Sequence, residues 1–332
     1  MANLLEVENL HVSFHTYAGE VQAVRGVSFT VKEGEAVAIV GESGCGKSVT
    51  AKAIMRLLPP GITDIKEGNI TFASSNLLDL PERKMQLFRG KEMSMIFQDP
   101  MTSLNPTMKI GEQIAEGLMK HNKISSKKAE VQAVELLRMV GIPEPERRVR
   151  QYPHEFSGGM RQRAMIAIAL ACQPKLLLAD EPTTALDVTI QAQILELLKE
   201  LQQKLGTSLV LITHDLGVVA ETCERVVVMY AGQVVETGKV KDIFNNPLHP
   251  YTQGLLKTIP RIDRDRKQTL EPIPGTPPDL LDPPKGCAFF ARCPYAMKIC
   301  QSETPELLEI ENKQLARCWL HHPIAKRMYQ ES

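Results

Sequence analysis

Short runs of alternating apolar and polar residues occur throughout residues 4–40. Residues 10–14 read Leu-His-Val-Ser-Phe, and residues 27–31 read Val-Ser-Phe-Thr-Val. Side chains of a strand point alternately to its two faces, so this alternation predicts an antiparallel strand layer. Residues 35–40 instead contain the unbroken apolar run Ala-Val-Ala-Ile-Val, which predicts a strand buried on both faces.

The hydrophobic pattern changes to a helical period after residue 99. Apolar residues recur every three to four positions in 110–119 and 129–140, with polar breaks between them. This spacing predicts a helical subdomain inserted over about 99–160. Strand and helix patterns then alternate, which predicts a parallel sheet with helices on both faces. The segments of this alternation are 175–179, 189–204, 208–213 and 225–230.

The composition changes again near residue 245. Nine prolines lie between positions 247 and 284. Prolines at this density interrupt helices and strands, so they predict a loop-rich segment. We therefore expect an α/β domain over 1–245 and a separate C-terminal extension over 246–332.

A glycine-rich loop follows the buried strand directly and precedes a helical pattern at 49–58. Its sequence is Gly41-Glu42-Ser43-Gly44-Cys45-Gly46-Lys47-Ser48. A loop in this strand–helix context binds phosphate, because its backbone N–H groups and the helix N-terminus face the phosphate oxygens. In such a loop the Lys47 ammonium reaches the β- and γ-phosphates, and the Ser48 hydroxyl is a ligand of Mg²⁺.

An acid pair, Asp180-Glu181, ends the apolar run 176–179. Successive residues at a strand end point in different directions, so the two carboxylates can have different roles. One carboxylate suits a magnesium ion and the other suits the activation of a water molecule. The pair could alternatively cap the helix that follows.

A serine and two glycines, Ser157-Gly158-Gly159, precede a helix predicted over 160–171. The serine is a good N-cap, and a helix N-terminus attracts anions, but a cap alone would not need two glycines. The phosphate loop, this motif and the acid pair, in this order, resemble the nucleotide-binding domain of ABC (ATP-binding cassette) ATPases. There the Ser-Gly-Gly motif of one subunit covers the ATP held by another subunit's phosphate loop. The resemblance implies an ABC-type P-loop NTPase that needs a partner subunit for efficient hydrolysis.

The same resemblance implies roles for other residues by position. Gln98, after a strand-like segment, matches the Q-loop glutamine, which touches Mg²⁺ and the attacking water. His214 matches the switch histidine that contacts the γ-phosphate, and residues 184–187 match the D-loop at the dimer interface. Asp180 then holds Mg²⁺ through water, and Glu181 is the general base.

An aromatic residue near the N-terminus should stack on adenine, either Phe14 or, as the second choice, Tyr17. The resemblance implies catalytic roles for Glu181, His214 and Gln98, and magnesium binding by Ser48, Gln98 and Asp180. The residues expected to contact ATP are Phe14, Gly41, Glu42, Ser43, Gly44, Cys45, Gly46, Lys47, Ser48, Val49, Ser157, Gly158, Gly159, Gln162 and Asp187.

Four of the seven cysteines lie in the last fifth of the chain, with gaps of five, six and seventeen residues. Four thiolates can hold zinc or a [4Fe–4S] cluster, although structural zinc sites usually have tighter pairs. Disulfides are disfavoured in a reducing cytoplasm, and unrelated free thiols are the remaining alternative. The four are Cys287, Cys293, Cys300 and Cys318.

The surroundings of these cysteines resemble the C-terminal extension of dipeptide and oligopeptide permease ATP-binding subunits, in particular the D-type subunit. The resemblance rests on Leu-His-Pro-Tyr-Thr at 248–252, Gly-Cys at 286–287 and Arg-Cys-Pro at 292–294. It implies a [4Fe–4S] cluster on the four cysteines, with zinc ranked second.

The charge balance and the hydropathy limit the choice of partners. Lys plus Arg and Asp plus Glu both number 39, so the chain lacks the basic excess of a general nucleic-acid binder. We find no apolar run near the ~18–20 residues needed to span a bilayer and no signal-peptide pattern, so we expect a cytoplasmic protein. Any transport role must then act through separate membrane subunits.

The resemblance as a whole implies an ATPase subunit that powers import of di- and oligopeptides from the cytoplasmic face of the membrane. Its implied partners are a second homologous ATP-binding subunit, two transmembrane permease subunits and an extracellular peptide-binding protein. The alternatives are a nickel importer of the same branch, a non-transport ABC ATPase, or a module that senses redox state through its cysteines. The sequence does not name the cargo.

Overall fold

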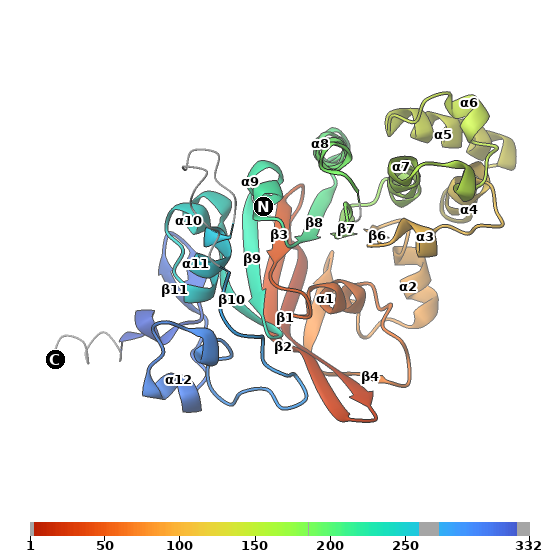
Figure 1. Ribbon diagram of the computed structural model, residues 1–332. Coiled ribbons are helices and arrows are strands. Elements are labelled where there is room, and N and C mark those ends of the chain that lie inside the picture. The colour runs from red at the N-terminus through yellow and green to blue at the C-terminus, as the bar shows by residue number, and fades with distance from the viewer. Residues whose placement is uncertain (1–2, 185, 259–271, 324–332) are drawn as a thin grey trace. The chain divides into compact units, whose positions relative to one another are not determined.

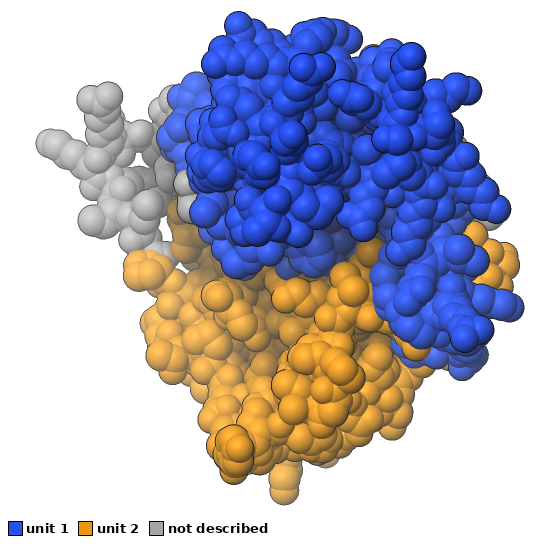
Figure 2. All heavy atoms as spheres, turned by 90° about the vertical axis from the view of Figure 1, so that its right-hand side faces the viewer, with its two compact units in different colours: residues 1–4, 31–36, 76–212 blue, residues 5–30, 37–75, 213–332 orange. Residues whose placement is uncertain are grey.

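The computed structural model describes residues 3–184, 186–258 and 272–323, and the chain forms two compact units (Figure 2). The first unit contains residues 1–4, 31–36 and 76–212, and the second contains residues 5–30, 37–75 and 213–332. The C-terminal extension therefore belongs to the same unit as the N-terminal strands and the phosphate loop.

An antiparallel sheet forms the first layer of the second unit (Figure 1). Its strand order is β2-β1-β4-β5, and β1 runs antiparallel to β4. The buried positions of β1 are mostly apolar, as the alternating pattern predicts. The strands are β1 (Asn3–Thr16), β2 (Gly19–Lys32), β4 (Thr63–Phe72) and β5 (Ser75–Asn76).

A mixed sheet forms the second layer of this unit. β3 (Ala36–Val40) pairs in parallel with β9 (Arg225–Tyr230), and β9 pairs antiparallel with β10 (Gln233–Lys239). Two short strands of the extension, β12 (Gln314–Ala316) and β11 (Leu308–Glu311), continue the sheet beyond β10. The extension is thus attached to the cassette by backbone hydrogen bonds as well as by side chains.

Short helices surround this sheet (Figure 1). A core of apolar side chains lies between the sheet and the helices that follow it, and Tyr230, Tyr251 and Phe289 are its largest buried members. The helices are α1 (Lys47–Ile54), α9 (Leu216–Thr222), α10 (Val240–Asn245), α11 (Pro250–Lys257) and α12 (Lys298–Ser302), with 3₁₀ turns η2 (Phe290–Arg292) and η3 (Trp319–His321).

The first unit has a parallel sheet in which β7 (Leu176–Asp180) lies between β6 (Met93–Ile96) and β8 (Ser208–Thr213). Every residue of these strands is buried, and most of them are apolar. α8 (Val188–Leu205) joins β7 to β8 with a buried stripe of leucine and isoleucine.

A group of helices is inserted between β6 and β7, in the part of the chain where the sequence predicts a helical subdomain over about 99–160. α4 and α5 pack against each other, and both contact α7. Each buries apolar residues four positions apart, such as Ile110, Ile114 and Leu118 in α4. The helices of this unit before α8 are α2 (Glu82–Phe88), α3 (Pro100–Ser103), α4 (Ile110–Asn122), α5 (Ser126–Met139), α6 (Pro145–Arg148) and α7 (Gly158–Leu170), with the 3₁₀ turn η1 (Pro153–Glu155).

No helix in the described part of the chain combines the length and the apolar character that a membrane span requires.

Candidate functional site

The phosphate loop leaves β3 and enters α1 through two glycines, Gly41 and Gly46, that no other residue could replace without movement. Gly41 and Gly46 have φ angles of 154° and 97°. A Cβ atom on Gly41 would lie 2.2 Å from the carbonyl oxygen of Met229, and one on Gly46 would lie 2.4 Å from that of Ala23. The neighbouring strands therefore fix the path of the loop, and they do so through backbone atoms that cannot easily give way.

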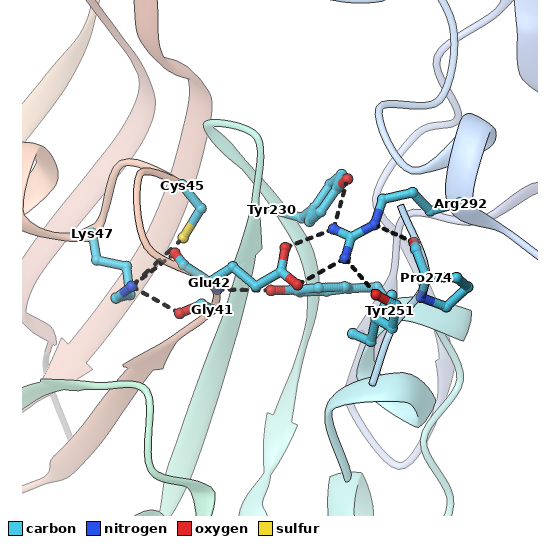
Figure 3. Close-up of polar contacts among 9 residues, drawn as sticks. Gly41, Glu42, Cys45, Lys47, Tyr230, Tyr251, Pro274 and Arg292 are labelled. Atoms are coloured by element: carbon cyan, nitrogen blue, oxygen red, sulfur yellow. Dashed lines mark hydrogen bonds and ion pairs between the residues drawn. The ribbon is translucent and has the colours of Figure 1, made fainter. Parts of the chain in front are cut away.

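Lys47 is the first residue of α1, and its side chain folds back across the loop (Figure 3). Its Nζ donates hydrogen bonds to the carbonyl oxygens of Gly41 at 2.8 Å and Glu42 at 3.0 Å. The residue is 4% exposed, so the ammonium is held in place by neutral groups. Burial raises the pKa of the nearby Cys45 thiol, which therefore stays uncharged beside this cation. Ser48 and Val49 are the next residues of α1.

The acid pair lies at the carboxyl end of β7. Asp180 is the last residue of the strand and is 2% exposed. Glu181 has a φ of 45°, an uncommon backbone conformation for a residue other than glycine. Its backbone N–H donates to the carbonyl oxygen of Ile212 at 2.9 Å, which fixes the turn. Strained backbone at this position is typical of a side chain that must be aimed.

Gln98 and Glu181 are in contact. The Gln98 Nε2 donates to Glu181 Oε2 at 2.8 Å, and the Thr184 hydroxyl donates to the same oxygen at 3.0 Å. Ile96 of β6 pairs with Ala179 of β7, and Gln98 and Glu181 each come two residues after this pair. The strand register therefore explains the contact. The sequence assigned Thr184 only to the D-loop and did not predict this contact, although its place three residues after Glu181 suits a hydrogen bond across a turn.

The Ser-Gly-Gly motif caps α7. The Ser157 hydroxyl accepts a hydrogen bond from the N–H of Met160 at 3.3 Å. A Cβ on Gly159 would lie 3.0 Å from Ile190 Cγ2, so this glycine is also needed for packing against α8. Asp187 caps α8 by accepting from the N–H of Ile190 at 2.9 Å. Packing against α8 within the same subunit therefore explains the second glycine, a role that the sequence did not reveal.

The remaining predicted site residues lie in different surroundings. Gln162 is 2% exposed, and its Nε2 has no hydrogen-bond partner among the described residues. Phe14 is half-buried in β1, whereas Tyr17 is fully exposed in the turn after it, so the choice of adenine partner stays open. His214 is exposed at the end of β8. Residue 185 of the expected D-loop lies outside the described residues.

The four C-terminal cysteines line one enclosed pocket together with aromatic rings that include Phe289 and Trp319. Burial raises the pKa of the Cys287 thiol to about 11 and that of the Cys318 thiol to about 12. Neighbouring cysteines also raise the pKa of Cys287 and that of Cys318, because a negative charge on one thiol disfavours a second negative charge nearby. The donor set is thus of the right kind for a metal or cluster. Even so, no three Cys, His, Asp or Glu residues in the described ranges form a group that could hold a metal ion.

Comparisons with known proteins identify the families that this chain resembles. The family model "ABC transporter" matches residues 24–184, and the model "Oligopeptide/dipeptide transporter, C-terminal region" matches residues 235–300. The oligopeptide transport ATP-binding protein OppD of Bacillus subtilis (strain 168) is 60% identical over 99% of this chain and 92% of that protein. The dipeptide transport ATP-binding protein DppD of the same organism is 56% identical over 96% of this chain and 95% of that protein.

A solved structure also resembles the fold. The ATP-binding cassette MJ0796, described as a dimer in a post-hydrolysis state bound to ADP and Pi, aligns with a TM-score of 0.64. It is 30% identical and covers 71% of this chain and 98% of its own.

Proposed function

The chain belongs to the ABC transporter family, among the oligopeptide and dipeptide transport ATP-binding proteins, and we propose that it hydrolyses ATP to power the import of peptides. The contact between Gln98 and Glu181 carries the catalytic part of this proposal, because it aims a carboxylate beside an amide at the end of a parallel strand. The C-terminal match over residues 235–300 supports the peptide cargo over nickel.

The phosphate loop is proposed to bind the triphosphate. Backbone N–H groups of residues 43–48 would face the phosphate oxygens, and the helix N-terminus of α1 adds positive potential. The Lys47 ammonium can exchange its two carbonyl partners for β- and γ-phosphate oxygens. A hydrogen bond between the ammonium and an anionic phosphate oxygen is stronger than the bonds from the ammonium to neutral carbonyls that it replaces, so the exchange favours binding.

Glu181 is proposed to accept a proton from the water that attacks the γ-phosphate. Gln98 and Thr184 both donate to Glu181 Oε2, and these two hydrogen bonds fix the orientation of the carboxylate. His214 is proposed to contact the γ-phosphate. The glutamate therefore arrives at the reaction with a fixed orientation.

Ser48, Asp180 and Gln98 are proposed to hold Mg²⁺, which when bound would withdraw charge from the β- and γ-phosphates. A hydroxyl, a carboxylate and an amide oxygen are the hard oxygen donors that magnesium prefers. Because the Gln98 nitrogen is bonded to Glu181, its oxygen is the atom that can face a cation.

A second, homologous ATP-binding subunit is proposed to complete the site, with Ser157, Gly158 and Gly159 of each subunit covering the other's ATP. The dimer described for the MJ0796 cassette supports this arrangement. Two permease subunits and an extracellular peptide-binding protein would complete the transporter, with this chain at the cytoplasmic face of the membrane. Residues 1–245 would act as the cassette and 246–332 as the extension.

A [4Fe–4S] cluster on Cys287, Cys293, Cys300 and Cys318 is proposed, with zinc as the second choice. Support comes from the donor set, since four thiols line one apolar pocket. Iron, sulfide and zinc analysis of anaerobically purified protein tests this, with Cys300→Ser as the comparison. Protein with neither iron nor zinc would contradict both proposals.

The experiment that tests the function is uptake of a labelled dipeptide, a labelled tetrapeptide and nickel by cells carrying Glu181→Gln. We expect peptide uptake to be lost because the general base is removed, with Glu196→Gln, an exposed position of α8, as the matched control. Loss of nickel uptake alone would instead indicate a metal importer. Normal uptake of all three in cells without a second peptide importer would contradict the transport function.

A further inference from the structure

The C-terminal extension reaches into the phosphate loop through one ion pair (Figure 3). Arg292 Nη1 lies 2.6 Å from Glu42 Oε2, and Arg292 Nη2 lies 3.0 Å from Glu42 Oε1. The two residues are 250 positions apart in the chain. The Arg292 side chain is 5% exposed and that of Glu42 is 26% exposed, so the pair is largely shielded from water. A two-pronged contact of this kind fixes direction as well as distance.

Contacts other than the ion pair also hold the Arg292 side chain in place. Its Nε donates to the carbonyl oxygen of Pro274 at 2.9 Å and its Nη2 to that of Ile273 at 3.2 Å. The guanidinium also lies 5.7 Å from the ring centre of Tyr230 and 5.9 Å from that of Phe289. Little side-chain freedom is then left to lose when the ion pair forms. The guanidinium is a fixed anchor supplied by the extension.

Tyr251 holds the backbone of the same loop residue. Its hydroxyl accepts a hydrogen bond from the N–H of Glu42 at 2.8 Å. The tyrosine is fully buried and packs against Tyr230, with ring centres 4.6 Å apart. Both the main chain and the side chain of Glu42 are therefore bound by residues that lie outside the loop.

These contacts act on the part of the loop that binds phosphate. Glu42 directly precedes the backbone N–H groups of residues 43–46, and its carbonyl oxygen also accepts from Lys47 at 3.0 Å. Its carboxylate would repel a triphosphate, and the repulsion would be strong because the surroundings are poorly solvated. Arg292 neutralises that charge and turns the carboxylate toward the extension.

We propose that Arg292 and Tyr251 are positioning residues for ATP, so that the C-terminal extension sets the affinity of the phosphate loop. The inference rests on the proposed function of this loop. It predicts that losing the guanidinium while Glu42 keeps its charge weakens ATP binding, and weakens ADP binding less because ADP carries one phosphate fewer.

The test is titration calorimetry of the purified full-length chain with Mg-ATP and Mg-ADP. We expect Arg292→Ala to weaken ATP binding about tenfold, and the double variant Arg292→Ala, Glu42→Gln to recover part of that loss. Arg317→Ala is the matched control. Arg317 also precedes a cysteine and donates to backbone carbonyls, at Val234 and Pro305, but it makes those bonds away from the loop.

Lys47→Ala separates this inference from the proposed function. If Lys47→Ala leaves ATP affinity unchanged, the loop is not the nucleotide site and the proposed function fails. If Lys47→Ala weakens binding but Arg292→Ala does not, the inference alone is wrong. Equal loss with Arg317→Ala, or no recovery in the double variant, would show that Arg292 serves only the fold of the extension. Should Arg292→Ala not fold, Tyr251→Phe and Arg292→Lys give the same test, with a smaller expected loss of ATP affinity.

Discussion

Acid should destabilise the C-terminal region through one buried histidine. His249 is 1% exposed, its Nδ1 accepts the N–H of Tyr251 at 3.0 Å, and its backbone N–H donates to Glu236 at 2.9 Å. Burial, with smaller electrostatic contributions from His321 and Arg317, lowers the pKa of His249 from 6.5 to about 3. The folded protein therefore binds this proton far less readily than the unfolded chain.

The sign and the size follow from these two pKa values. The stability that neutral His249 contributes is fully present above pH 6.5 and is lost as the pH falls toward 3. Between pH 7.5 and pH 5 the loss is about 2 kcal/mol, and it increases by up to about 1.4 kcal/mol for each further pH unit. The pKa of buried Glu236 is raised by desolvation, so its contribution is lost as the pH rises, in the opposite direction.

Thermal unfolding of the full chain from pH 7.5 to pH 5 measures this effect, with His249→Asn as the comparison. Asparagine keeps an acceptor for the N–H of Tyr251 but does not titrate, so the variant should have a lower midpoint at pH 7.5 and a flatter pH profile. We expect the gap between the two midpoints to narrow by on the order of 4 °C on acidification. Parallel profiles would refute the reasoning, because every other titrating group is common to both proteins.

Two further changes test the nucleotide site. Gly46→Ala should weaken Mg-ATP binding about tenfold or more, because its Cβ would lie 2.4 Å from the carbonyl oxygen of Ala23. Gly61→Ala is the control, since Gly61 also has a positive φ but nothing lies within 4 Å of its Cβ position. In the same calorimetric titration, Gly61→Ala should bind Mg-ATP normally. Gln98→Glu should place a second carboxylate against Glu181, and the repulsion between them should raise the pKa of the pair. The pH profile of steady-state ATP hydrolysis by the assembled transporter should therefore shift to higher pH. Gln98→Ala should lower kcat without that shift, and a shift in both variants would show that charge is not the cause.

Local patterns were enough to predict the elements that bury one continuous face. The strand at 225–230 has the observed bounds, and the helix at 189–204 differs by one residue at each end from Val188–Leu205. The sequence did not predict the contact between Gln98 and Glu181, which arises because both residues come after buried strands whose carboxyl ends meet at one edge of a parallel sheet. The residues that predict the strand and the helix lie within a few positions of one another, whereas Gln98 and Glu181 are 83 positions apart.

Other elements have no such local signal. β10 has polar residues at Gln233, Glu236 and Thr237, which suggest a surface loop, yet all three are buried. Glu236 is tolerated there because it accepts hydrogen bonds from the backbone of Leu248 and from Gln314, which lie 12 and 78 positions further along the chain. A buried carboxylate needs its donors in place, so β10 can form as it does only when the extension packs beside it.

The ion pair of Glu42 with Arg292 also depends on a segment far along the chain. A phosphate-loop motif identifies Glu42 as a neighbour of phosphate, but nothing near it in sequence indicates what cancels its charge. That cation is supplied 250 residues later, from a segment whose prolines and cysteines suggested only an appendage. A largely shielded carboxylate left unpaired would be costly, so a cassette with glutamate at this position depends on its extension in a way that one with a neutral residue does not. Removing the extension should therefore weaken nucleotide binding by the phosphate loop more when position 42 is Glu than when it is Gln.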